Sequence, residues 1–118
     1  MATDDVVERL AAVESVMRGL AAVFDVPATE TEVAALEHQA SAPDLWDDQE
    51  NAQRVTSRLA YLQGELRDFT ALTSRVADVP VMFDLADAEG DESARAEALE
   101  ELASLERDLN DAEVRTLL

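Results

Sequence analysis

Residues 43–53 read Pro43-Asp44-Leu45-Trp46-Asp47-Asp48-Gln49-Glu50-Asn51-Ala52-Gln53 and form a sharp break in the helical pattern of the chain. It separates two helical patterns and contains the only tryptophan of the chain. A proline stops the helix before it, because its ring disfavours helical geometry in the preceding residue. Asp47 and Glu50 have capping-box spacing, which predicts a long helix that begins near Asp48. The stretch is therefore predicted to be a sharp turn between two helices.

The apolar pair within this turn has two interpretations. Leu45 and Trp46 directly precede the predicted cap, where an apolar residue can pack onto the first helical turn. A lone tryptophan between two helices favours a core position for Trp46. Its alternative role is an exposed anchor for a partner.

The long helix after the turn has the most regular apolar pattern of the chain. Its seam has heptad spacing with Thr73 as its one polar member: Ala52, Val55, Leu59, Leu62, Leu66, Phe69 and Val76. From Asp48 to Ala77 the helix is about 45 Å long and must pair lengthwise with another long helix. Gly64 is expected on its outer side. Asp78-Val79-Pro80 is predicted to interrupt it.

A second seam follows this interruption. Residues 81–85 are expected to form a short apolar turn or helix, although a run this short also fits a strand. The acidic residues 84–92 predict a turn, and either Asp91 or Ser93 can cap a last helix ending near Leu117. Its seam is Leu99, Leu102, Leu105, Leu109 and Ala112. The long and last helices are expected to form an antiparallel hairpin.

Two further helices are predicted before the turn. The first runs from about Thr3, its expected N-cap, to Asp25, with Val6, Leu10, Val13, Met17, Leu20 and Phe24 along one face. It packs along the hairpin or at one end, and Val26-Pro27 terminates it. Thr29 and Glu32 predict a capping box for a short helix that ends at Ser41 and turns Val33, Leu36 and Ala40 inward.

Length and composition agree with one small helical domain. The chain has 118 residues, 47% of them hydrophobic but only 4% aromatic, so aliphatic side chains must build the core. The predicted fold class is all-α: a small bundle on a long, coiled-coil-like antiparallel hairpin over residues 1–118. There is no cysteine and therefore no disulfide. The acidic N-terminus resembles no signal peptide, no long apolar run indicates a membrane helix, and a cytoplasmic location is expected.

The charge indicates which partners to expect. The formal net charge is −18, and all nine basic residues are arginine. Such a surface repels phosphates, which argues against DNA binding or a broad RNA-binding face. Basic proteins, or the basic parts of a ribonucleoprotein, are the expected partners.

No residue set predicts catalysis, a cofactor or a metal site. His38 has no second ligand or nucleophile beside it. Aligning Gly90 with the glycine of an EF-hand loop places Leu85 and Ala96 at positions that require oxygen ligands. Asp47 and Asp48 are better explained by helix capping than by acid–base chemistry. We therefore expect this chain not to be an enzyme.

Three stretches resemble the N-terminal helical domain of the bacterial peptide chain release factor 2 family. The tryptophan-containing stretch with Ala52-Gln53 is similar to the family's Pro-Asp-(Leu/Val)-Trp segment. Phe83-Asp84-Leu85-Ala86 is similar to the stretch before its last domain-one helix. Residues 113–118, Glu-Val-Arg-Thr-Leu-Leu, are similar to the end of that helix.

The resemblance implies a part of a translation termination factor. In that family the complete protein reads UAA or UGA and directs peptidyl-tRNA hydrolysis through a Gly-Gly-Gln loop. This chain has no adjacent glycines and no Ser-Pro, so both the catalytic and the codon-reading motifs are expected to lie beyond Leu118. The resemblance implies ribosome docking near the stalk base of the large subunit, facing the release factor 3 GTPase. It assigns no contact residue.

A freestanding acidic adaptor that dimerises through its leucine seams is the alternative interpretation. Two matching seams within one chain favour intramolecular pairing, and we expect a monomer.

Overall fold

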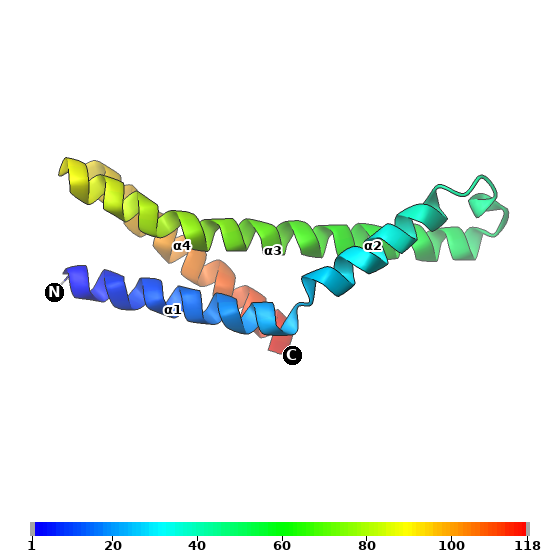
Figure 1. Cartoon of the computed structure of the whole chain (residues 1–118), viewed down its shortest axis with the longest axis horizontal. Helices are drawn as coiled ribbons and strands as arrows, with labels where there is room; N and C mark the ends of the chain where they lie inside the picture. Colours follow the sequence, from blue (N-terminus) through cyan, green and yellow to red (C-terminus); the bar gives the residue numbers. More distant parts are fainter. Residues whose placement is uncertain (1, 118) are drawn as a thin grey trace. The chain divides into compact units, whose positions relative to one another are not determined.

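The computed structural model describes residues 2–117 and is helical almost throughout. Its elements in chain order are α1 (Ala2–Val23), α2 (Val26–Ala40), the short 3₁₀ helix η1 (Leu45–Asp47), α3 (Gln49–Glu89) and α4 (Glu92–Leu117) (Figure 1). No strand occurs among residues 2–117. The predicted all-α fold class is therefore confirmed, while residue 118 of the predicted last motif lies outside the described residues.

These helices form two compact units. The terminal unit comprises Met1–Phe24 and Ala71–Leu118, and the central unit comprises Asp25–Thr70. Helix α3 contributes its first part to the central unit and its second part to the terminal unit. Within residues 2–117, no helix has an apolar stretch that would cross a bilayer.

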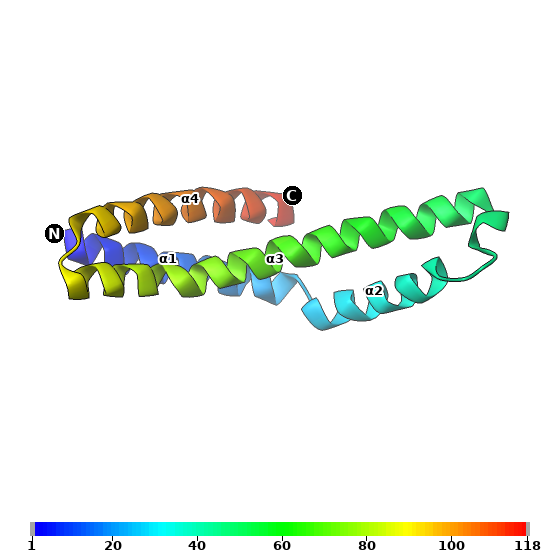
Figure 2. The same cartoon turned by 90° about the horizontal axis from the view of Figure 1, so that it is seen from above.

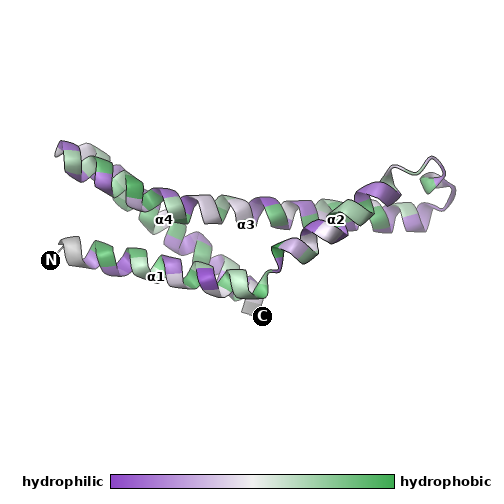
Figure 3. Ribbon diagram, viewed as in Figure 1, coloured by the Kyte–Doolittle hydropathy of each residue, from purple (hydrophilic) through white to green (hydrophobic). Residues whose placement is uncertain are grey.

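The terminal unit is a three-helix arrangement. The second part of α3 and all of α4 run antiparallel, while α1 runs in the same direction as α4 (Figures 1 and 2). Its buried side chains come from all three helices: Val6, Val13, Met17, Leu20, Val76, Val79, Phe83, Ala86, Ala98, Leu102, Leu105, Leu109 and Ala112. The predicted hairpin is thus present, and α1 packs along it. Figure 3 shows hydrophobic and hydrophilic residues interleaved along each helix.

The hairpin closes later than the sequence analysis predicts. Helix α3 does not stop at residues 78–80 but continues through Pro80 to Glu89. Residues 76, 79, 83 and 86 extend the seam with alternating spacings of three and four, and all four are buried. This burial offsets the hydrogen bond that proline removes from the helix. The predicted short segment at 81–85 and most of the predicted acidic turn are therefore parts of α3.

A single glycine makes the actual turn between α3 and α4. Gly90 has a φ of 61°, a left-handed backbone conformation that residues with a Cβ atom rarely adopt. Asp91 then caps α4, because its Oδ1 accepts a hydrogen bond from the backbone N–H of Ala94 at 3.0 Å. Of the two predicted caps, Asp91 rather than Ser93 is used.

The starts of two other helices also differ from their predictions. Helix α1 begins at Ala2, so Thr3 lies inside its first turn instead of preceding it. Helix α2 begins at Val26, and Asp25 caps it by accepting from the N–H of Ala28 at 3.0 Å. The predicted Thr29 capping box was wrong because Pro27 is accepted in the first turn of a helix, where its missing N–H costs nothing.

The central unit is an antiparallel pair made by α2 and the first part of α3. Its core contains Leu36, Leu45, Ala52, Val55 and Leu62, with Val33, Ala40 and Leu59 packed against them. The inward residues predicted for α2 lie in this core, as do Ala52, Val55, Leu59 and Leu62 of the seam predicted for α3. The next two seam residues, Leu66 and Phe69, are only partly buried. The loop between the two helices carries η1, and the candidate site lies there.

Candidate interaction site

Backbone hydrogen bonds hold the loop between α2 and α3 in one conformation. The N–H of Ser41 donates to the carbonyl of Glu37 at 3.1 Å, and the N–H of Leu45 donates to that of Ala42 at 3.1 Å. The N–H of Asp47 donates to the carbonyl of Asp44 at 3.1 Å, which closes η1. This loop therefore presents its side chains from an ordered backbone.

Leu45 and Trp46 point in different directions from this loop. Leu45 is 6% exposed and belongs to the core of the central unit, whereas Trp46 is 59% exposed. Neighbouring residues of a 3₁₀ helix lie about 120° apart around its axis, so one faces inward while the next faces solvent. The predicted core position of Trp46 was wrong. Leu45 fills the core position instead, which leaves the indole on the surface.

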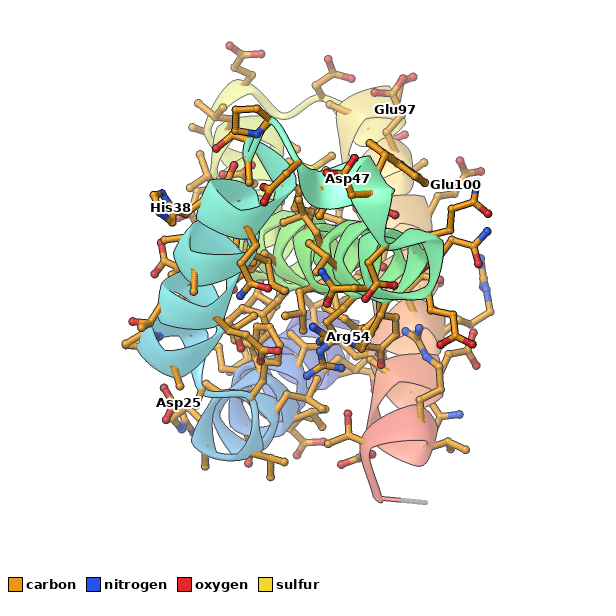
Figure 4. All side chains as sticks on the ribbon, turned by 90° about the vertical axis from the view of Figure 1, so that its right-hand side faces the viewer. Asp25, His38, Asp47, Arg54, Glu97 and Glu100 are labelled. Carbon is orange, nitrogen blue, oxygen red and sulfur yellow. The ribbon has the colours of Figure 1, made fainter. Side chains whose placement is uncertain are left out.

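The acidic residues beside Trp46 have separate roles. Asp48 caps α3 by accepting from the N–H of Asn51 at 3.1 Å, so the helix starts one residue later than the Asp47–Glu50 capping box predicted. Within the described residues, the side chains of Asp44 and Asp47 form no hydrogen bond or ion pair. Figure 4 shows Asp47 on the outer side of η1. Two carboxylates next to the indole are thus available for a partner.

An open groove of about 380 Å³ lies in the same loop. Its lining comes from the end of α2, the loop and the start of α3: Gln39, Ala42, Asp44, Leu45, Asp47, Asp48 and Asn51. Three of these are carboxylates and two are amides, so the groove offers mainly hydrogen-bond acceptors to a cation.

Arginine is absent from the stretch of sequence that contains this loop. Residues 19–53 contain eight acidic side chains and neither arginine nor lysine. The first arginine after them, Arg54, donates to Oδ1 of Asn51 at 2.8 Å. Its charge therefore lies at the edge of the groove, while Asp44 and Asp47 remain without a counter-ion.

The neighbouring ion pair stabilises the helices that present the loop. Arg58 on α3 donates to Glu32 on α2 through Nε at 2.9 Å and through a terminal nitrogen at 3.2 Å. These hydrogen bonds lower the pKa of Glu32 and raise the pKa of Arg58. Arg58 also lies 5.8 Å from the ring centre of Tyr61. Glu32, expected in a capping box, is instead one half of this bidentate pair.

The side chains considered for catalysis or metal binding lie apart on the surface or on a regular helix. His38 is exposed on α2 and points outward in Figure 4. No group of three potential metal-ligating side chains occurs among the described residues. The acidic residues 84–89, considered for calcium, lie on a regular helix. What the described residues do form is an acidic, all-helical structure with Trp46 exposed on its surface.

Comparison with known proteins places this domain in a family. The PCRF domain matches residues 29–118, so the chain belongs to the PCRF domain family. It is 50% identical to peptide chain release factor 2 of Acidothermus cellulolyticus and 46% identical to that of Streptomyces avermitilis, over 118 residues in each case. Against the factor of Mycobacterium avium it is 47% identical over 111 residues.

These alignments cover most or all of the chain but a minor part of each relative. The first two cover 100% of this chain and 32% of the relative, and the third covers 92% and 30%. The resemblance to release factor 2 that the tryptophan-containing stretch indicated is thereby confirmed. The chain spans about a third of the length of those relatives.

Proposed function

We propose that this chain is a non-catalytic docking domain of a translation termination factor and binds the ribosome. The observation that carries the proposal is its similarity, along its whole length, to proteins named peptide chain release factor 2. The complete factor would direct peptidyl-tRNA hydrolysis at UAA and UGA codons in the cytoplasm. This domain would supply none of the reacting groups.

The charge distribution supports docking through protein rather than RNA. A net charge of −18 repels rRNA phosphates but attracts basic ribosomal proteins and speeds their encounter. By the family resemblance, the position would be near the stalk base of the large subunit, within reach of the release factor 3 GTPase. The chain has two compact helical units with arginine–carboxylate pairs, which suits a domain that positions other parts of the complete factor.

Competition tests this proposal. Termination complexes carrying labelled peptidyl-tRNA are mixed with release factor 2 from one of the relatives and with increasing amounts of this chain. The chain alone should release no peptide, and an excess should slow release by the complete factor. Peptide release by the chain alone would contradict the non-catalytic assignment. Unchanged release at saturating excess would contradict docking at the same position.

A further inference from the structure

We propose that the surface around Trp46 is the face that binds a partner, and that the partner is a basic protein segment presenting an arginine. The inference rests on the proposed docking function and names the docking face and the chemistry of its occupant. Three features occur together on one ordered loop: an exposed indole, two carboxylates without a counter-ion, and an open groove.

The indole of Trp46 is largely exposed to solvent. Trp46 leaves more than half of its surface in water although Leu45, directly before it, is buried. A tryptophan in this position is well suited to bury its surface against a partner, and tryptophan is among the residues that most often dominate binding energy. The loop is already ordered, so binding loses little conformational entropy.

The carboxylates beside Trp46 determine the sign of the charge that a partner must carry. Asp44 and Asp47 flank the indole in sequence, and no arginine or lysine occurs between residues 19 and 53. A phosphate-rich or anionic lipid surface would meet uncompensated repulsion here. A cationic protein segment gains attraction to both carboxylates, while the nearby positive charge of Arg54 is held at the edge of the groove by Asn51.

Arginine suits this surface better than lysine. A guanidinium is planar, stacks on an indole face and donates two parallel hydrogen bonds to a carboxylate. An ammonium attracts both groups by its charge but has no planar face and no paired donors. The central unit contains a similar arrangement of its own, with Arg58 against Tyr61 and Glu32. At η1 the aromatic and acidic groups are present and the arginine is missing.

The only tryptophan of the chain makes the test direct. A short peptide of alternating arginine and serine is titrated into the chain while the fluorescence of Trp46 is followed. The other probes are a matched peptide with lysine in place of arginine, a matched peptide with glutamate in place of arginine, and a single-stranded RNA oligomer. We expect the arginine peptide to bind, the lysine peptide to bind several-fold more weakly, and glutamate and RNA not to bind. Equal binding of RNA, or of the glutamate peptide, would overturn the inference.

Variants test the same surface on ribosomes. Trp46→Ala, and separately Asp44→Asn with Asp47→Asn, should each weaken sedimentation of the chain with ribosomes by about tenfold. Two controls match these variants: Tyr61→Ala removes an equally exposed aromatic side chain, and Glu30→Gln with Glu37→Gln makes the same change in charge. Each control should change the sedimentation of the chain with ribosomes by less than about twofold. Circular dichroism confirms that each variant is folded.

The two proposals fail in different ways. If the chain does not bind ribosomes at all, the docking function is wrong, while the arginine peptide still decides whether the surface recognises arginine. If wild type and both η1 variants bind ribosomes equally, docking uses another face and this inference is wrong.

Discussion

Arg9 on α1 and Glu106 on α4 are joined by two hydrogen bonds, from Nε to Oε2 at 3.0 Å and from a terminal nitrogen to Oε1 at 2.6 Å. The two residues are 97 positions apart in sequence. Their pairing raises the pKa of Arg9. Along with the apolar side chains of α1, this pair attaches the first helix to the last one.

Breaking this pair should loosen α1. We expect a double-mutant cycle with Arg9→Ala and Glu106→Ala to give a coupling energy of about 0.5–1 kcal/mol, since about a third of each side chain meets solvent and is screened. Urea unfolding followed by circular dichroism measures it. Arg18→Ala, an exposed arginine on the same helix, is the control and should change the free energy of unfolding by less than about 0.5 kcal/mol. A coupling energy indistinguishable from zero would contradict the attachment.

The same substitution at two glycines should have opposite effects. Gly64 lies inside α3, where a new Cβ meets only the flexible end of Arg67 at 3.7 Å. Gly64→Ala should therefore stabilise the chain by up to about 1 kcal/mol. Gly90→Ala should destabilise it by about 1 kcal/mol, because alanine is strained at a φ of 61°. Thermal unfolding compares the two variants with wild type. A shift of both unfolding temperatures in the same direction would contradict the assignment of Gly90 as the turn.

Pro80 offers a test of the continuous α3. In a helix its N–H would donate to the carbonyl of Val76, so Pro80→Ala should restore a hydrogen bond and remove a steric clash. We expect a stabilisation of about 1–2 kcal/mol, after allowing for the greater freedom of the unfolded chain. Chemical unfolding measures this change. A loss of stability would indicate that residues 78–80 form a break, as the sequence pattern predicted.

The fold could be predicted where the apolar spacing was regular. The inward face of α2 and most positions of the α3 and α4 seams, such as Leu62 and Leu102, followed directly from that spacing. At the start of the α4 seam, Ala98 is buried and the predicted Leu99 is only partly buried. The helix boundaries could not, because local propensity competes with packing. Pro80 predicts a break by itself, but buried Val79 and Phe83 on either side hold it in the helix.

The candidate site was located but its orientation was wrong. The proline and the acidic residues of 43–48 predict the turn, and Trp46 fits either a core or an exposed position by sequence alone. Which of Leu45 and Trp46 points inward depends on the phase of a three-residue helix, and composition does not determine that phase. The bidentate pair of Glu32 with Arg58 joins residues 26 positions apart, and no local pattern predicts it.

The Glu32–Arg58 pair makes a prediction about pH. The folded pKa of Glu32 lies below its unfolded value, so its contribution to stability is present above the unfolded pKa and is lost as the pH falls through the folded one. Wild type should exceed Glu32→Gln in free energy of unfolding near neutral pH. The difference should narrow as the pH falls below about 4. Urea unfolding at several pH values measures it, and a constant difference would show that the carboxylate contributes no charge interaction.

Sedimentation of the chain with bacterial ribosomes tests the central claim most directly. Increasing concentrations of wild type and of Trp46→Ala are spun through a cushion with a fixed amount of ribosomes, and the bound fraction is measured at low and high salt. We expect saturable binding that weakens with salt and falls about tenfold in Trp46→Ala. Failure of the wild type to bind saturably would contradict it.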